Sequence, residues 1–154
     1  MPSHASLTGA DLHEPKGAAA ATANKVYVSD GAASGSWKSG AVGAVTGSLV
    51  DVSSGSADGL TYIVLPYACT VTKVSTVLHN AITAADNTLT VTNHAGSSMG
   101  TITVAFSGSA AGDIDTLTPS SNNTFTAGQR IKITSDGVGS TASKLGITVE
   151  FTYT

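Results

Sequence analysis

Apolar and polar residues alternate in short runs from residue 60 to the end of the chain. The clearest run spans 144–154, where every second residue from Leu145 to Tyr153 is apolar. A period of two predicts strands with one buried face and one face in water, as in antiparallel sheets. We predict strands at 60–65, 69–80, 87–93, 101–106, 113–118, 123–127, 129–135 and 144–154.

The apolar positions within these runs predict which side chains face the core. Val71 has one phase and Val74, Thr76 and Leu78 have the other, which predicts a β-bulge near Thr72-Lys73. Cys69 is expected to be a small buried hydrophobic residue. The other predicted inward positions are Leu89, Val91, Ile102, Val104, Phe106, Ile114, Leu117, Phe125, Ile131, Ile133, Leu145, Ile147, Val149, Phe151 and Tyr153.

The spacing of these strands predicts the class of fold. About eight short strands at roughly 8–12-residue intervals are typical of all-β sandwiches and barrels. We therefore expect an antiparallel, jelly-roll-like β-sandwich. An immunoglobulin-like sandwich is the alternative, although the Cys…Trp…Cys pattern of that fold is missing.

The first part of the chain has a different pattern. Val26 and Val28 alternate with Lys25 and Tyr27, and Asp30-Gly31 follows, so a short strand and hairpin are predicted. Residues 31–43 are rich in Gly, Ser and Ala and are expected to form a loop that carries Trp37. We predict an arm with a short hairpin at 1–43, a linker containing a first strand at 44–59, and the sandwich at 60–154.

The amino-acid composition excludes some classes of function. Charged residues make up 11% of the chain, against roughly 25% in typical soluble domains. The net charge is −3 without a basic run, so nucleic-acid binding through phosphate contacts is not expected. The first residues lack the features of a signal peptide, and no apolar run approaches roughly 18 residues. We expect assembly in a cytoplasm and no membrane partner.

Two motifs are candidate catalytic sites. Residues 96–100 match G-x-S-x-G, but a nucleophile elbow needs a helix after the serine and a later histidine. Here a strand is predicted to follow, and His94 is the last histidine, so we predict a hairpin loop. Asp113 and Asp115 share a strand face and could bind Ca²⁺ or transfer protons. No third acidic residue accompanies them, so a solvated strand face is the preferred interpretation.

The histidines and the single tryptophan give no stronger signal of chemistry. His4, His13, His79 and His94 lack the spacing of metal ligands. We therefore predict no metal site, no cofactor and no enzymatic activity. Trp37 could contact a partner subunit, close the hairpin by packing on Val26 and Val28, or stack on a sugar.

The stretch from Leu7 to Trp37 reads LTGADLHEPKGAAAATANKVYVSDGAASGSW. Its first ten residues place two apolar positions, Leu7 and Leu12, among polar ones, which is too little to form a core. The stretch resembles the N-terminal segment of small virion proteins of tailed bacteriophages, either capsid decoration (cement) proteins or head-fibre proteins. That resemblance implies attachment to the major capsid protein on the outer surface of the head, and a homotrimer.

Under this interpretation the arm makes the partner contacts. We expect them to come from apolar anchors and from pairing of an added strand. The alternative is a tail-fibre or receptor- and glycan-binding module attached through the same arm. A glycan hydrolase is the least favoured hypothesis, because it needs paired carboxylates in a cleft. The predicted capsid- or subunit-binding residues are Leu7, Leu12, His13, Pro15, Val26, Tyr27 and Trp37.

Overall fold

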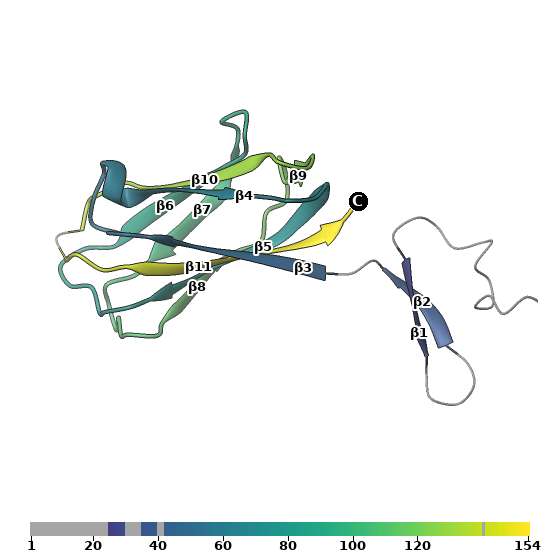
Figure 1. Cartoon of the computed structure of the whole chain (residues 1–154). Helices are drawn as coiled ribbons and strands as arrows, with labels where there is room; N and C mark the ends of the chain where they lie inside the picture. The colour runs from purple at the N-terminus through teal and green to yellow at the C-terminus, as the bar shows by residue number, and fades with distance from the viewer. Residues whose placement is uncertain (1–24, 30–34, 40–41, 140) are drawn as a thin grey trace, which may run out of the picture. The chain divides into compact units, whose positions relative to one another are not determined.

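The computed structural model describes residues 25–29, 35–39, 42–139 and 141–154. The chain divides into two compact units, Met1–Ala41 and Val42–Thr154. In the first unit, β1 (Lys25–Ser29) and β2 (Gly35–Ser39) pair as an antiparallel hairpin (Figure 1). The predicted hairpin is confirmed, but the prediction that Trp37 lies in a loop is wrong. The β2 sequence, GSWKS, has no apolar alternation, so only its pairing with β1 reveals it as a strand.

The second unit contains nine strands and one turn of 3-10 helix in the part of the chain that the structure describes. All eight strands predicted after residue 60 are present, with ends shifted by a few residues. The elements are β3 (Val42–Leu49), η4 (Ala57–Gly59), β4 (Leu60–Val64), β5 (Cys69–Leu78), β6 (Asn87–Thr92), β7 (Ser98–Val104), β8 (Ile114–Leu117), β9 (Thr124–Phe125), β10 (Arg130–Ser135) and β11 (Leu145–Tyr153).

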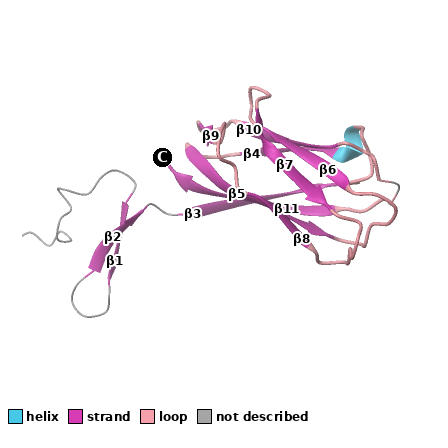
Figure 2. Cartoon of the chain, turned by 180° about the vertical axis from the view of Figure 1, so that it is seen from behind, coloured by secondary structure: helices cyan, strands magenta, loops and turns pink. Residues whose placement is uncertain are grey.

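These strands form a jelly-roll sandwich. The antiparallel pairs are nested along the chain: β6 pairs with β7, β5 with β8 and β9, β4 with β10, and β3 with β11. Pairing of β10 with β6 and of β11 with β5 joins them into two sheets, ordered β4-β10-β6-β7 and β3-β11-β5-β8. Figures 1 and 2 show both sheets, from opposite sides of the sandwich. This nested, rolled-up pairing is the jelly-roll topology, so the predicted fold is confirmed.

The predicted bulge in β5 is also confirmed. Glu150 of β11 pairs with Lys73, and the next residue, Phe151, pairs with Val71. Thr72 is therefore the extra residue, and the inward phase of β5 changes at this point. A second irregularity lies between β6 and β7, where Val91 pairs with Gly100 and Thr92 with Ser98. Sequence alternation did not predict this one.

The hydrophobic core lies between the two sheets and contains most of the predicted inward residues, including Cys69, Val71, Phe125 and Phe151. Tyr153 is half-buried and packs against it. Two predictions were wrong: Phe106 is 43% exposed and Ile114 is 65% exposed. Phe106 lies beyond the end of β7, where the alternation no longer applies. In β8, Leu117 pairs with the buried Val74 and therefore faces inward. Ile114 is an odd number of residues away from Leu117, so it faces outward.

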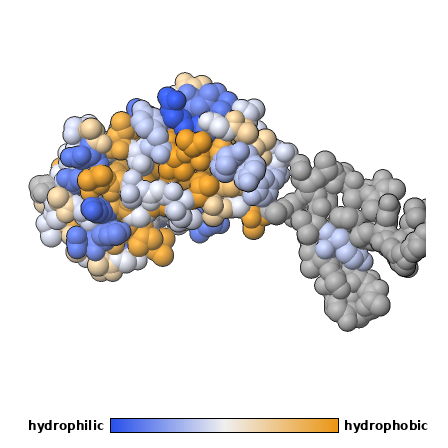
Figure 3. All heavy atoms as spheres, in the orientation of Figure 1, coloured by the Kyte–Doolittle hydropathy of each residue, from blue (hydrophilic) through white to orange (hydrophobic). Residues whose placement is uncertain are grey.

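The first strand of the sandwich, β3, is an edge strand of the five-stranded sheet. The sandwich therefore includes 42–49, which the sequence analysis divided between the arm and the linker. Gly47 is needed on its inner face, because an added Cβ would lie 2.9 Å from Ile63 Cδ1. The bare backbone lets β3 approach β4 of the facing sheet. Figure 3 shows apolar surface over the middle of the body, where β3 and β4 lie in front.

Candidate functional site

The predicted partner-binding residues fall into two groups. Leu7, Leu12, His13 and Pro15 lie outside the described residues. Val26, Tyr27 and Trp37 lie in the β1–β2 hairpin, where the register pairs Tyr27 with Trp37 and Val26 with Lys38. The Tyr27 side chain is half-buried. The backbones of Tyr27 and Trp37 therefore lie directly opposite each other in the hairpin.

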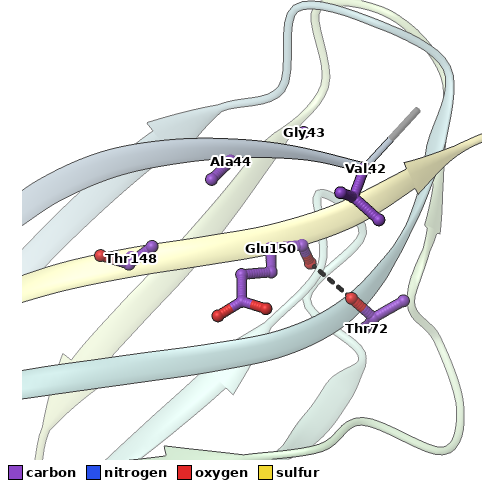
Figure 4. Close-up of a pocket in the computed structure, with 6 residues that line it drawn as sticks. All are labelled: Val42, Gly43, Ala44, Thr72, Thr148 and Glu150. Atoms are coloured by element: carbon purple, nitrogen blue, oxygen red, sulfur yellow. Dashed lines mark hydrogen bonds between the residues drawn. The ribbon is translucent and has the colours of Figure 1, made fainter.

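A shallow groove of about 370 Å³ lies on the outer face of the five-stranded sheet. It is lined by six residues from three neighbouring strands: Val42, Gly43 and Ala44 of β3, Thr148 and Glu150 of β11, and Thr72 of β5 (Figure 4). The groove is open to solvent, and Val42 is 79% exposed. The groove could not be predicted from the sequence, because its residues become neighbours only through strand pairing.

The β5 bulge shapes this groove. Thr72, the extra residue, donates a hydrogen bond from its hydroxyl to the carbonyl oxygen of Glu150, at 3.2 Å. The Glu150 carboxylate is 3.9 Å from Lys73 Nζ, and both side chains are about half exposed. The lining therefore offers methyl groups, hydroxyls and one carboxylate neutralised by a neighbouring lysine. Glu150 is the one acidic side chain among the residues that line the groove.

The G-x-S-x-G segment begins in the hairpin loop between β6 and β7, as predicted, but its last three residues, Ser98 to Gly100, already belong to β7. The Asn93 side-chain oxygen accepts hydrogen bonds from the backbone N–H groups of Ala95 and Ser97, both at 3.0 Å. This is the local bonding by which asparagine side chains stabilise turns. Strand β7 begins at Ser98, so the serine is not followed by the helix that a nucleophile elbow requires.

Asp113 and Asp115 behave differently from the predicted solvated face. Asp113 is exposed and accepts a hydrogen bond from the Ala110 backbone N–H, at 2.6 Å. Asp115 lies on the half-buried face of β8. Burial raises the pKa of Asp115, and the charge of Asp113 raises it further. An inward-pointing charge on an edge strand discourages pairing with another chain. The structure thus favours a protective role for Asp115.

The remaining titratable candidates are isolated from one another. His79 and His94 are exposed, as predicted. His94 Nε2 lies 3.1 Å from Gln129 Nε2. Cys69 is buried, and this burial raises the pKa of its thiol. Within the described ranges, no three His, Cys, Asp or Glu side chains gather as metal ligands would.

A cationic patch that the sequence did not predict lies on the outer face of the four-stranded sheet. There the Arg130 guanidinium carbon lies 5.0 Å from the centroid of the Tyr62 ring. This distance is within the range of a cation–π contact. Lys132 pairs directly across from Tyr62. Alternation within each strand is enough to place Tyr62, Arg130 and Lys132 on an outward face. Only the pairing of β4 with β10 brings the three residues together.

Comparisons with known proteins add no assignment. No family model matches the chain, and no curated protein sequence matches it. In the part of the chain that the structure covers, no helix has the length and apolar character to span a membrane. The arguments for function therefore come from the residues and the fold.

Proposed function

We propose that the protein is a structural component of a tailed-phage virion that binds the outer surface of the capsid as a decoration, or cement, protein. Residues 1–41 attach it to the major capsid protein, and the body stabilises the head by linking neighbouring capsid subunits. One observation carries the proposal: the residues that resemble virion arms, 7–37, belong to a separate compact unit that precedes the jelly roll.

The division of the chain supports this assignment. The unit Val42–Thr154 has its own continuous core of buried residues. It therefore needs no packing from residues 1–41 to bury its apolar surface. The first unit is left to serve another purpose, and attachment is the one that its resemblance implies. Jelly rolls are also common among viral capsid domains.

Capsid binding by arm variants tests the proposal. Purified capsids that lack the protein are mixed with the full chain, with the fragment 42–154, and with the full-length variant Leu7→Asp/Leu12→Asp. We expect saturable binding of the full chain and at least a tenfold loss of affinity for the other two. The fragment lacks the arm, and in the double variant a charge at an apolar anchor opposes its burial. Thr103→Asp, an exposed change on β7, is the matched control and should bind normally.

The same particles test stability and location. Capsids carrying the full chain should release their contents at a higher temperature than bare capsids, because a ligand that binds only the intact shell stabilises it. Gold labelling of virions should mark the head. Equal binding by the fragment 42–154 would contradict the proposal, and labelling confined to the tail would support the tail-fibre alternative.

A further inference from the structure

The cationic patch, defined as Tyr62, Val64, Arg130 and Lys132, is an exposed surface of mixed apolar and basic character. Tyr62 is 51% exposed and Val64 is 58% exposed. Arg130 pairs with Val64, and Lys132 pairs with Tyr62, so the four residues lie on two adjacent strands. The ion pair found among the described residues is Lys73 with Glu150, on the other sheet. Arg130 and Lys132 therefore have no described carboxylate within 4 Å.

The opposite end of the same sheet has the complementary character. Asp58, Asp86 and Asp136 are all exposed there. Asp58 precedes β4, Asp86 precedes β6, and Asp136 follows β10. The antiparallel register brings these three positions to one end, since Ser135 pairs with Leu89 and Thr134 with Leu60.

Exposed apolar side chains accompany these carboxylates. The Phe106 N–H donates to Asp86, at 2.9 Å, and the Val138 N–H donates to Asp136, at 3.2 Å. Phe106 is 43% exposed and Val138 is 65% exposed. We call these four residues, together with Asp58, the acidic end. One end of the sheet is thus aromatic and basic, and the other is apolar and acidic.

We propose that copies of this chain associate head to tail, with the cationic patch of one copy against the acidic end of the next. Two like ends would bring charges of the same sign together, so a twofold contact of either end with itself is disfavoured. Tyrosine and arginine are also enriched at the centres of protein interfaces. A contact between two different surfaces of one chain closes into a ring when its rotation permits.

This inference rests on the proposed function, because the resemblance to virion proteins implies a homotrimer. It specifies the surfaces that form the contact. The trimer would be a closed ring of three such contacts, in which each copy uses both ends of its four-stranded sheet. The five-stranded sheet, with its groove, would then remain available to other partners.

Charge reversal at each end tests the contact. In the full chain, the patch variant is Arg130→Glu/Lys132→Glu, and the end variant is Asp58→Lys/Asp86→Lys. We expect light scattering to give the wild type a multiple of the 15.2 kDa monomer mass, and each variant alone to fall to that mass. A variant that combines all four substitutions should recover the wild-type mass, because its reversed patch and its reversed end again carry opposite charges in every contact of the ring.

Controls separate a lost contact from a lost fold. Lys73→Glu, on the other sheet, should keep the wild-type mass. High salt should lower the mass of the wild type, because the Debye length falls to about 3 Å at 1 M. A wild type that is monomeric at every concentration, or a patch variant that keeps its mass, would overturn the proposal. Recovery of mass in the combined variant itself demonstrates that the substitutions leave the fold intact, and a folded combined variant that does not recover it would also overturn the proposal.

The outcome is independent of the capsid experiment. A monomer that still binds capsids would reject head-to-tail association and leave the proposed function intact. An oligomer that fails to bind capsids would reject the proposed function alone.

Discussion

The two sheets of the jelly roll have similar inner faces and different outer faces. Inside, both present aliphatic and aromatic side chains to one shared core. Outside, the five-stranded sheet carries a groove whose one carboxylate, Glu150, is paired with Lys73. The four-stranded sheet carries Arg130 and Lys132 beside an exposed tyrosine, with no described carboxylate within 4 Å. The inner faces are therefore constrained by packing, and the outer faces are where the sheets can differ in function.

The largest expected effect comes from the inner face. Phe151 is 2% exposed in the core, so Phe151→Ala should lower the free energy of unfolding by about 3–5 kcal/mol through lost burial and a residual cavity. Tyr62→Ala, on an outer face, should cost only about 0.5–1 kcal/mol from its lost contact with Arg130. Urea denaturation of both variants measures the difference, and equal losses would break the distinction between the faces.

A buried hydrogen bond should have the next largest effect. The Ser135 hydroxyl donates to the Val52 carbonyl and accepts from the Gly137 N–H, and the Ser135 side chain is buried. Ser135→Ala should cost about 1–3 kcal/mol because it leaves buried polar groups without partners. Thr103→Ala, on the exposed face of β7, is the control and should change the urea midpoint little. An unaltered midpoint for Ser135→Ala would show that water replaces the hydroxyl.

Two aspartates should respond to pH with opposite signs. Burial raises the native pKa of Asp115 above its ordinary value. Its protonation therefore favours the folded state, and this stability is lost as pH rises through the raised pKa. Asp115→Asn should therefore raise the melting temperature slightly at neutral pH. The corresponding gain in the free energy of unfolding should be about 0.5 kcal/mol or less. The substitution should also make the melting temperature depend less steeply on pH in the acidic range.

Asp51 is the comparison for that titration. A hydrogen bond from the Ser53 hydroxyl lowers the pKa of Asp51. The charged form therefore favours the folded state, and its contribution is lost as pH falls through the lowered pKa. Asp51→Asn should lower the melting temperature at neutral pH and have a smaller effect in acid. Shifts of the same sign for both variants would contradict the pKa directions.

The smallest effect is expected at the surface ion pair. Lys73 and Glu150 are 3.9 Å apart and about half exposed, so Lys73→Ala should cost about 0.5 kcal/mol or less. Differential calorimetry at low and high salt should detect little change. A loss above about 1 kcal/mol would mean that the lysine stem packs on the sheet more closely than an exposed ion pair requires.

Much of the fold could be predicted because alternation depends on the residues alone. The run from Leu145 to Tyr153 and the phase change at Thr72 both correspond to observed structure. Prediction failed where pairing sets the structure. Nothing in the sequence of β2 indicated a strand before β1 was known to pair with it. Ile114 faces outward because Leu117 follows the phase of Val74, a partner 43 residues away in sequence.

The candidate surfaces were harder to predict than the fold. Tyr62 and Arg130 are far apart in sequence, and the groove joins three strands. Local patterns assign a side chain to a face but do not identify its neighbours across the sheet. The arm residues Leu7 and Leu12 stand out as apolar positions among polar ones, and the resemblance implies their role in attachment; this role remains a prediction because both residues lie outside the described residues.

In the proposed assembly, the first unit attaches this jelly roll to a capsid, and the outer face of the four-stranded sheet joins it to another copy. A reconstruction of the intact particle tests both parts directly. We expect density for the body on the outer shell, joined to the capsid through residues 1–41, with Tyr62 and Arg130 facing the acidic end of a neighbouring copy. Density for the protein on the tail, or no density for it anywhere on the particle, would contradict both proposals.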